Sequence, residues 1–318
     1  MAQWEPFYYG GQEGFMTYAA ETGILTPKDA PIIGAAGTQL LAGLANVPGY
    51  NVNDNTAPVR GAGAARAVTF LPMRREFTID NQILLSAGAA TKLFLQSALR
   101  ATPNATIANA NRHLCLPLIS VGGGAIGACD TARTSKWLAR YAMFNTLTLT
   151  FAENQPATAA FQLWPLYIEQ NATYTVPAIS ETSILAVSGQ PFAFQHLSFS
   201  IGATQYETGI TSATISVNNK LRRVGTRNPV ASDPTSRAAR QIVTDGEDVT
   251  INLSMNAPLE FAGETTIGTI VVALTDGVST ITITVTANWH ANSGQNSTAP
   301  DGAYGYSASI LSSSLAIT

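Results

Sequence analysis

The stretch Ala213–Met255 reads ATISVNNKLRRVGTRNPVASDPTSRAARQIVTDGEDVTINLSM and decides the fold class. It opens with alternating apolar and polar residues up to Asn218 and closes with a second alternating run from Val249 to Met255. An alternation with a period of two predicts strands that bury one face of a sheet. We therefore expect two amphipathic β-strands joined by a long connection.

The connection between these two strands is strongly basic. Between Lys220 and Arg240 the only acid is Asp233. The cations of this segment are Lys220, Arg222, Arg223, Arg227, Arg237 and Arg240. A loop of this length inside a compact domain is usually functional or disordered. The sequence therefore predicts a basic arm that binds a partner.

The composition indicates a folded protein whose surface is poor in charge. Of the 318 residues, 46% are hydrophobic and 12% are charged, and the formal net charge is −3. The charged share is about half of the usual 25% or so, and a chain of this length can hold one or two domains. Since copies of such a protein repel each other only weakly, we expect its surface to be largely covered by further copies of the same chain.

Positive and negative charges are segregated along the chain. All 17 Lys and Arg lie within Lys28–Arg140 or Lys220–Arg240, whereas residues 141–219 and 241–318 contain acids and no base. The acids that we expect to receive the basic arm, or to line the inside of an assembly, are Glu153, Glu207, Asp245, Glu247 and Asp248. This separation favours head-to-tail packing, with the basic arm of one copy against the acidic sheet of the next.

Three regions follow one another along the chain. Residues 1–63 are rich in Gly, Ala, Pro and Asn, which predicts an extended N-terminal arm and loops. Residues 64–200 predict a first β region with helices at Thr91–Arg100 and Thr131–Phe144. Residues 201–318 predict a second β region with the basic arm and a C-terminal hairpin. Both β regions have a Thr-rich strand, a turn or loop and a return strand, so tandem β-domains are one option.

Some strands can be predicted in more detail. Ala67–Asp80 contains two short strand patterns around Pro72. Near the C-terminus, Ile281 and the apolar residues after it alternate with threonines, which places Trp289 on the apolar face of its strand. The final segment SILSSSLAIT predicts a strand at a sheet edge.

No motif in the sequence anchors an enzymatic reaction. Gly122–Gly127 reads GGGAIG but lacks the Lys-Ser/Thr of a P-loop, which favours a turn. His113, Cys115 and Cys129 lack the fourth ligand of a zinc site, so we expect no metal and no other cofactor. Because no G-x-S-x-G motif is present, His196 is interpreted as a structural residue facing out of a strand. These patterns favour a protein that is not an enzyme.

The N-terminal sequence MAQWEPFYYGG has neither the basic start nor the apolar core of a signal peptide. Its aromatic residues are candidates either to pack in the core or to anchor an interface with a partner; they are Trp4, Phe7, Tyr8 and Tyr9. No apolar run reaches the roughly 18 residues of a membrane-spanning helix. We expect a soluble protein from a reducing compartment, without membrane insertion.

Two segments of the chain resemble a known family. Lys136–Leu166 reads KWLARYAMFNTLTLTFAENQPATAAFQLWPL, and Leu197–Pro229 reads LSFSIGATQYETGITSATISVNNKLRRVGTRNP, continuing to VTINLSM. Their order of strand, turn, strand, Asn-Asn, basic arm and strand resembles that of siphophage major tail tube proteins. The match covers Lys136–Met255 and includes no catalytic signature.

The resemblance implies a mainly β fold: an antiparallel β-sandwich with a flanking helix, whose hairpins form a shared β-barrel lumen. It implies a virion protein that self-assembles into stacked rings and forms the non-contractile tail tube that conducts DNA during ejection. The rings would be hexamers of one tube domain or trimers of two tandem domains, and the sequence leaves both open. The partners would be further copies, other tail proteins at the tube ends and DNA in transit. Assembly would take place in the cytoplasm of the bacterial host.

The distribution of charge agrees with this expectation. A tube through which duplex DNA slides should not hold phosphates, so its wall should lack Lys and Arg. Residues 141–219 and 241–318 contain neither. The basic arm would then lie between rings, and its lack of interleaved aromatic residues favours a protein partner over a nucleic acid.

Two alternatives stay open, and only the second belongs to a different class. One is a different phage structural protein, namely a capsid, decoration or distal tail hub protein. The other is a β-sandwich enzyme that acts on carbohydrate, which requires a pair of positioned carboxylates in a cleft.

Overall fold

A computed structural model of the chain confirms a mainly β fold with antiparallel sheets, compatible with a β-sandwich. The structure describes residues 14–20, 39–41, 49–61, 66, 69–99, 114–120, 135–170, 191–206, 210–226, 237–256, 266–297 and 304–318. Expectations for Trp4, Phe7, Tyr8, Tyr9, Gly122–Gly127, His113 and Cys129 lie outside these ranges.

The elements of the N-terminal half are β1 (Gly14–Ala20), β2 (Gln39–Leu41), β3 (Asn51–Val59), β4 (Thr69–Leu84), α1 (Ala89–Gln96), β5 (Leu114–Ser120), β6 (Ser135–Ala152), β7 (Thr158–Trp164) and β8 (Tyr167–Gln170). Those of the C-terminal half are a short 3-10 helix η1 (Phe194–His196), β9 (Leu197–Ile201), β10 (Thr204–Gln205), β11 (Ile210–Asn218), β12 (Leu221–Thr226), β13 (Ala239–Thr244), β14 (Asp248–Met255), β15 (Thr266–Ile267), β16 (Ile270–Thr275), β17 (Thr280–Ser297) and β18 (Tyr304–Ile317).

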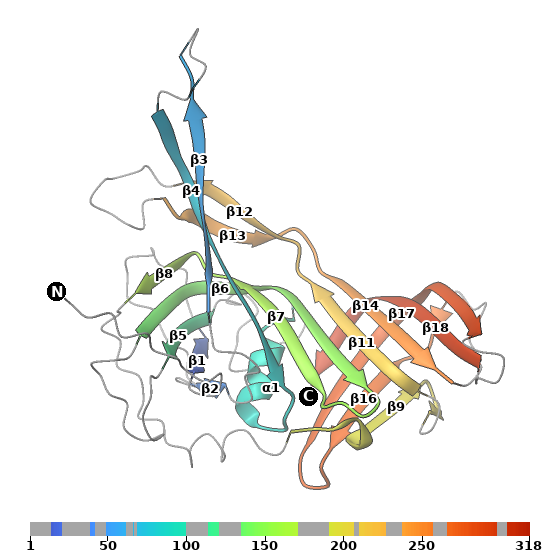
Figure 1. The fold of residues 1–318 in the computed structure, drawn as a ribbon. Helices are drawn as coiled ribbons and strands as arrows, with labels where there is room; N and C mark the ends of the chain where they lie inside the picture. The colour runs from blue at the N-terminus through green and yellow to red at the C-terminus, as the bar shows by residue number, and fades with distance from the viewer. Residues whose placement is uncertain are drawn as a thin grey trace.

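One large sheet organises the molecule (Figure 1). Its strand order is β10-β9-β16-β17-β18-β14-β11-β6-β5-β1-β2, with β7 and then β4 joined along β6 and with β3 paired to β4. The strands β12 and β13 form a separate two-stranded sheet. Because β6 pairs directly with β11, hydrogen bonding is continuous between the two predicted β regions, and their boundary at residues 200 and 201 falls inside β9.

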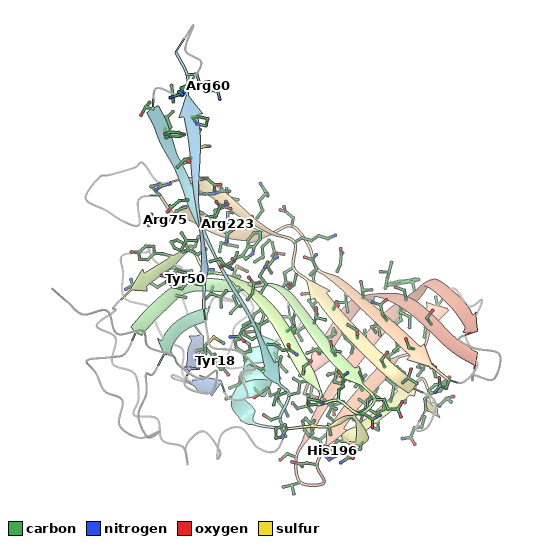
Figure 2. The ribbon with its side chains drawn as sticks, viewed as in Figure 1. Tyr18, Tyr50, Arg60, Arg75, His196 and Arg223 are labelled. Carbon is green, nitrogen blue, oxygen red and sulfur yellow. The ribbon has the colours of Figure 1, made fainter. Side chains whose placement is uncertain are left out.

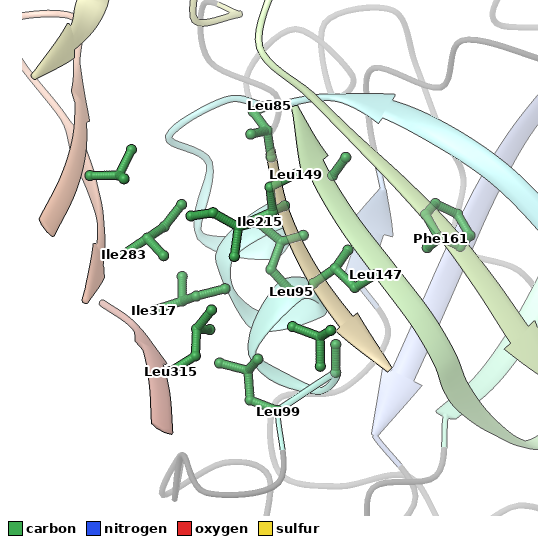
Figure 3. Close-up of a cluster of buried hydrophobic side chains, with 14 of the residues drawn as sticks. Leu85, Leu95, Leu99, Leu147, Leu149, Phe161, Ile215, Ile283, Leu315 and Ile317 are labelled. Atoms are coloured by element: carbon green, nitrogen blue, oxygen red, sulfur yellow. The ribbon is translucent and has the colours of Figure 1, made fainter. Parts of the chain in front are cut away.

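The alternation predicted for Ala213–Met255 is confirmed and builds the core. β11 and β14 are antiparallel neighbours in which Ile215 lies opposite Ile251, and both side chains are fully buried. Figure 3 shows Ile283 and Ile317 on one side of the interior and Ile215 on the other, with Leu95 of α1 in the same cluster. The strands therefore enclose a main dry interior that includes the helix, and a second, smaller cluster lies between β6 and the β12–β13 strands.

The helix α1 confirms the first predicted helix, although it ends at Gln96. Its Phe94 packs against three aromatic rings, with centroid distances of 5.2 Å to Tyr18, 4.9 Å to Phe144 and 5.0 Å to Phe161. Gln96 donates a hydrogen bond to the carbonyl of Ile317 at 2.7 Å and so joins the helix to β18. The helix is held by burial of its apolar face, since it has no side-chain N-cap.

The second predicted helix, Thr131–Phe144, is wrong where the structure describes it, because residues from Ser135 onward belong to β6. Ala142, Met143 and Phe144 are all buried in succession, so this part of β6 is covered on both faces. A strand buried on both faces loses its alternation and looks like a helix segment in the sequence.

The predicted N-terminal arm and the two short strands around Pro72 also need correction. Within residues 1–63 the structure describes three strands, and Met16 and Tyr18 of β1 belong to the core. Pro72 lies inside the continuous strand β4, at a point where β4 is paired to β3 alone. Proline is tolerated there because the other side of the strand has no ladder to break.

The C-terminal segment is central, whereas the sequence predicted an edge strand. β18 lies between β17 and β14. Strict alternation buries residues that are an even number of positions apart. Val285 and Asn288 of β17 are three apart and both buried, and so are Leu315 and Ser312 of β18, so the buried side switches along both strands. Trp289 is consequently 47% exposed, and its prediction as an inward residue is wrong. The amide of Asn288 donates to the carbonyls of Gly268 and Val285, which satisfies backbone acceptors at this irregular point.

The two faces of β11 allow a direct stability test. Ile215→Ala should lower the free energy of unfolding by about 2–5 kcal/mol, because it leaves a cavity in the dry interior. The neighbouring Thr214→Ala, on the half-exposed face, should change it by less than about 0.5 kcal/mol. Urea denaturation followed by circular dichroism measures both, and equal losses for the two variants would contradict the assignment of faces.

Candidate functional site

The basic segment Lys220–Arg240 is a hairpin and not an open loop where the structure describes it. β12 and β13 pair from Leu221 opposite Thr244 to Thr226 opposite Ala239. This hairpin crosses beside the root of a longer one, β3–β4, which extends away from the body (Figures 1 and 2). The place where the two hairpins meet is the candidate site.

Asn219 anchors the start of the β12–β13 hairpin. Its side chain is 1% exposed and donates to the carbonyls of Ala98 and Phe144, each at 2.9 Å. Its backbone N–H donates to the carbonyl of Asn145, and its own carbonyl accepts from the hydroxyl of Thr244 at 2.6 Å. One buried amide therefore fixes the hairpin to the end of the helical segment and to β6.

Arg223 of β12 is the innermost contact between the two hairpins (Figure 2). Its side chain is 6% exposed, donates to the carbonyl of Phe77, and lies over the ring of Trp164 at 4.1 Å from the centroid. Arg74 donates to the carbonyl of Arg223 at 3.0 Å, and Glu76 lies 3.6 Å from its guanidinium. Burial lowers the pKa of Arg223 to about 10, which still leaves it charged at neutral pH. A buried cation is tolerated only where it is paired and hydrogen-bonded, as it is here.

Arg237, just before β13, also contacts the base of the β3–β4 hairpin. It donates to the carbonyls of Met73 at 2.8 Å and Asn55 at 3.3 Å, and lies 3.2 Å from Asp54. Arg75 of β4 donates to Asp54 at 2.5 Å, while its backbone N–H donates to the carbonyl of Arg237 at 2.9 Å. The hydrogen bond from Arg75 holds the pKa of Asp54 below its ordinary value. We name Arg223, Arg237, Arg74 and Arg75 the arginine brace.

The structure pairs several of the predicted site residues within the chain. Arg222 donates to Asp245 at 2.9 Å, and Lys220 lies 2.6 Å from Asp248; both pairs are exposed. The hydrogen bond between Arg222 and Asp245 raises the pKa of the guanidinium and lowers that of the carboxyl. These cations and acids thus meet inside one subunit, and a role between subunits stays a prediction.

The remaining predicted residues do not join the brace. Glu153 is exposed in the turn between β6 and β7, and Glu247 is half-buried just before β14. Arg227 and Glu207 lie outside the described residues, as does the side chain of Arg240. His196, expected on a strand, ends the 3-10 helix, where its Nδ1 accepts from the backbone of Ala193 at 3.1 Å.

Sequence reasoning missed the projecting part of the molecule. Beyond the brace, residues 69–73 of β4 continue for about 16 Å at roughly 3.3 Å per residue. This part exposes Phe70, Leu71 and Met73, which are 62%, 56% and 53% exposed. The run TFLPM resembles a core strand in the sequence, and only the absence of acids from residues 55–73 signals a different role.

The outer face of the central sheet is uncharged over most of its area. Every second residue points away from the core and is half-buried or exposed within residues 146–150 of β6, 212–216 of β11, 250–254 of β14 and 307–309 of β18. These residues are Thr146, Thr148, Thr150, Ser212, Thr214, Ser216, Thr250, Asn252, Ser254, Ser307 and Ser309. Adjacent strands bring them into register, with Thr148 opposite Ser216 and Ser216 opposite Thr250. We name this surface the hydroxyl face.

The described residues contain no group of three or more His, Cys, Asp or Glu side chains arranged to bind a metal ion. A hollow of about 550 Å³ lies at the turn after β6 and is lined by Glu153, Gln155, Pro156 and Phe194, among others. It offers one carboxylate, whereas glycoside hydrolysis uses two. Within the described part of the chain, no helix has the length and apolar content needed to cross a membrane.

Comparison with known proteins gives no family assignment. No protein-family model matches the chain, and no curated protein matches it significantly. The features that bear on function are therefore the geometry of the hairpins and the hydroxyl face.

The arginine brace predicts unequal roles for two neighbouring arginines. Arg223→Ala should lower the free energy of unfolding by about 2–3 kcal/mol, because it removes a charged hydrogen bond and a cation–π contact. It should also speed amide hydrogen exchange at the β3–β4 root. Arg222→Ala, which breaks an exposed pair, should leave both unchanged. Hydrogen exchange with mass spectrometry measures the effect, and identical exchange in both variants would refute the brace.

Proposed function

We propose that this protein is a structural subunit that self-assembles into stacked rings, forming the tube through which a non-contractile phage tail conducts DNA. In this proposal it is not an enzyme and needs no cofactor. Its main partner is further copies of the same chain. Other tail proteins bind the ends of the tube, and the tube is part of the virion after assembly in the host cytoplasm.

The observation that carries the proposal is the hydroxyl face. A surface of Thr, Ser and Asn is wetted but offers no cation to hold a phosphate, so duplex DNA can pass it without binding. The described residues of β11 contain no charged side chain, and on β14 the only one is Asp248 at its first position. A folded subunit that places such a face opposite a dry core is suited to line a conduit.

The open hairpins support assembly as the mechanism. In the described residues, β3 has β4 as its only strand neighbour, and β12 and β13 pair only with each other. Unpaired strand edges are an aggregation hazard for a lone subunit, and closing a ring removes them. A two-stranded hairpin in water is also only marginally stable alone, which favours its covering by a neighbour.

The proposal predicts hollow particles from the purified protein. Negative-stain electron microscopy at high concentration should show rings or tubes with a regular axial repeat, because the exposed hairpins and edges require neighbours. Light scattering on rings gives the mass per ring, which separates trimers from hexamers. A compact monomer that never forms rings at any concentration would contradict the proposal.

Binding of DNA provides a second test, on the face itself. Assembled wild-type protein should retain no duplex DNA at physiological salt, because the hydroxyl face holds no phosphate. Ser216→Lys with Thr250→Lys places two cations side by side on this face, and the double variant should retain DNA with an affinity that falls steeply with salt. Equal retention by wild type and variant would mean that DNA does not contact the hydroxyl face.

A further inference from the structure

We propose that the projecting end of the β3–β4 hairpin docks on the Trp289–Leu311 pair of a second copy of this chain. This inference deepens the proposed assembly and rests on it. It names the two surfaces that meet and makes the contact heterologous, meaning that different patches of the two copies touch.

The hairpin supplies the first surface. Leu71 and Met73, two residues apart on β4, give its outer part an apolar side, beyond the register shift that places Arg75 opposite Asp54 and Pro72 opposite Thr56. Ala57, opposite Leu71 on β3, extends this apolar side. No other described strand pairs with this end of the hairpin. Large apolar side chains are thus left in water along the projection.

The second surface is on the body of the molecule. Trp289 of β17 and Leu311 of β18 are directly opposed in the sheet and are 47% and 49% exposed. Leu311 is also opposite Thr250, at the border of the hydroxyl face. The pair exists because the burial phase of both strands shifts next to Asn288, which turns a tryptophan outward.

These two surfaces account for most of the exposed large apolar side chains in the described residues. Those side chains are Val52, Phe70, Leu71 and Met73 in the hairpin, Trp289 and Leu311 in the sheet, and Val224 and Val278 elsewhere. Clustered apolar exposure marks an interaction site, whereas single exposed residues are ordinary. Tryptophan in particular is a frequent anchor of protein interfaces.

Charge decides in favour of a second copy as the occupant. Residues 55–73 contain Arg60 and Arg66 and no acid, and both arginines are exposed. Residues 241–318, which hold Trp289 and Leu311, contain seven acids and no Lys or Arg. Trp289 and Leu311 thus lie in a part of the chain that has a net negative charge and no Lys or Arg to repel the basic apolar hairpin. Within one chain the arginine brace directs the hairpin away from the body (Figures 1 and 2), so the sheet that receives it must come from a neighbour.

Mixed cysteine variants test the contact directly. Full-length Leu71→Cys and Leu311→Cys proteins are prepared separately, mixed, assembled and treated with a short bismaleimide. The expected result is a cross-linked dimer that forms only in the mixture. The matched control pairs Leu71→Cys with Val278→Cys, a site that is 93% exposed in the β16–β17 turn. Since docking raises the local concentration of the two thiols, the product should exceed this control by at least about tenfold.

Further controls separate the possible outcomes. The wild type carries Cys115 and Cys129 and gives the background, and circular dichroism with microscopy shows that each variant folds and assembles. Assembled mixtures without the product, or with equal product from Val278→Cys, overturn the docking proposal and leave the proposed function standing. A wild type that never forms rings overturns the proposed function, and the docking proposal falls with it.

Discussion

The alternation of dry and wetted side chains along β6, β11 and β14 is the constraint on which the rest of the structure depends. One set of side chains, such as Leu149, Ile215 and Ile251, closes a continuous interior around α1. The other set is composed almost entirely of hydroxyl and amide groups. Because both sets come from the same strands, the demand for a stable core also fixes a broad, uncharged outer surface. A single slip of register would exchange the two.

The arginine brace fixes the β3–β4 hairpin relative to this sheet. Its guanidinium groups bind backbone carbonyls of Phe77, Met73 and Asn55, so they grip the hairpin by its main chain. Removing such a buried cation leaves these carbonyls without their donor, so the brace stabilises the root of the hairpin. The same contacts fix the direction in which the hairpin leaves the body.

The sequence predicted those features that depend on local patterns. The strands of Ala213–Met255 and the helix near Thr91 followed from their periodicity. The segment before Phe144 was mistaken for a helix because burial on both faces removed the alternation. Trp289 was placed inward because a shift of burial phase has no signal in the sequence.

The candidate site was predictable only in part, for a related reason. The basic residues of Lys220–Arg240 stand out in the sequence, but the groups that they contact cannot be read from it. Arg223 binds a carbonyl 146 residues away, and no local pattern announces a contact of that range. The projecting hairpin was hidden for the opposite reason, because its exposed Leu71 and Met73 have the chemistry of core residues.

The two prolines of the projecting hairpin have a consequence for the free subunit. Pro58 lies in β3 and Pro72 in β4, and in a sheet a proline occupies the edge where its missing N–H faces solvent. Each open edge of the ribbon therefore has a gap in its row of donors. A foreign strand cannot extend along it in a continuous ladder, which is how cross-β fibres grow. The prolines thus protect a single copy of the chain from fibre growth along the edges of this exposed apolar ribbon.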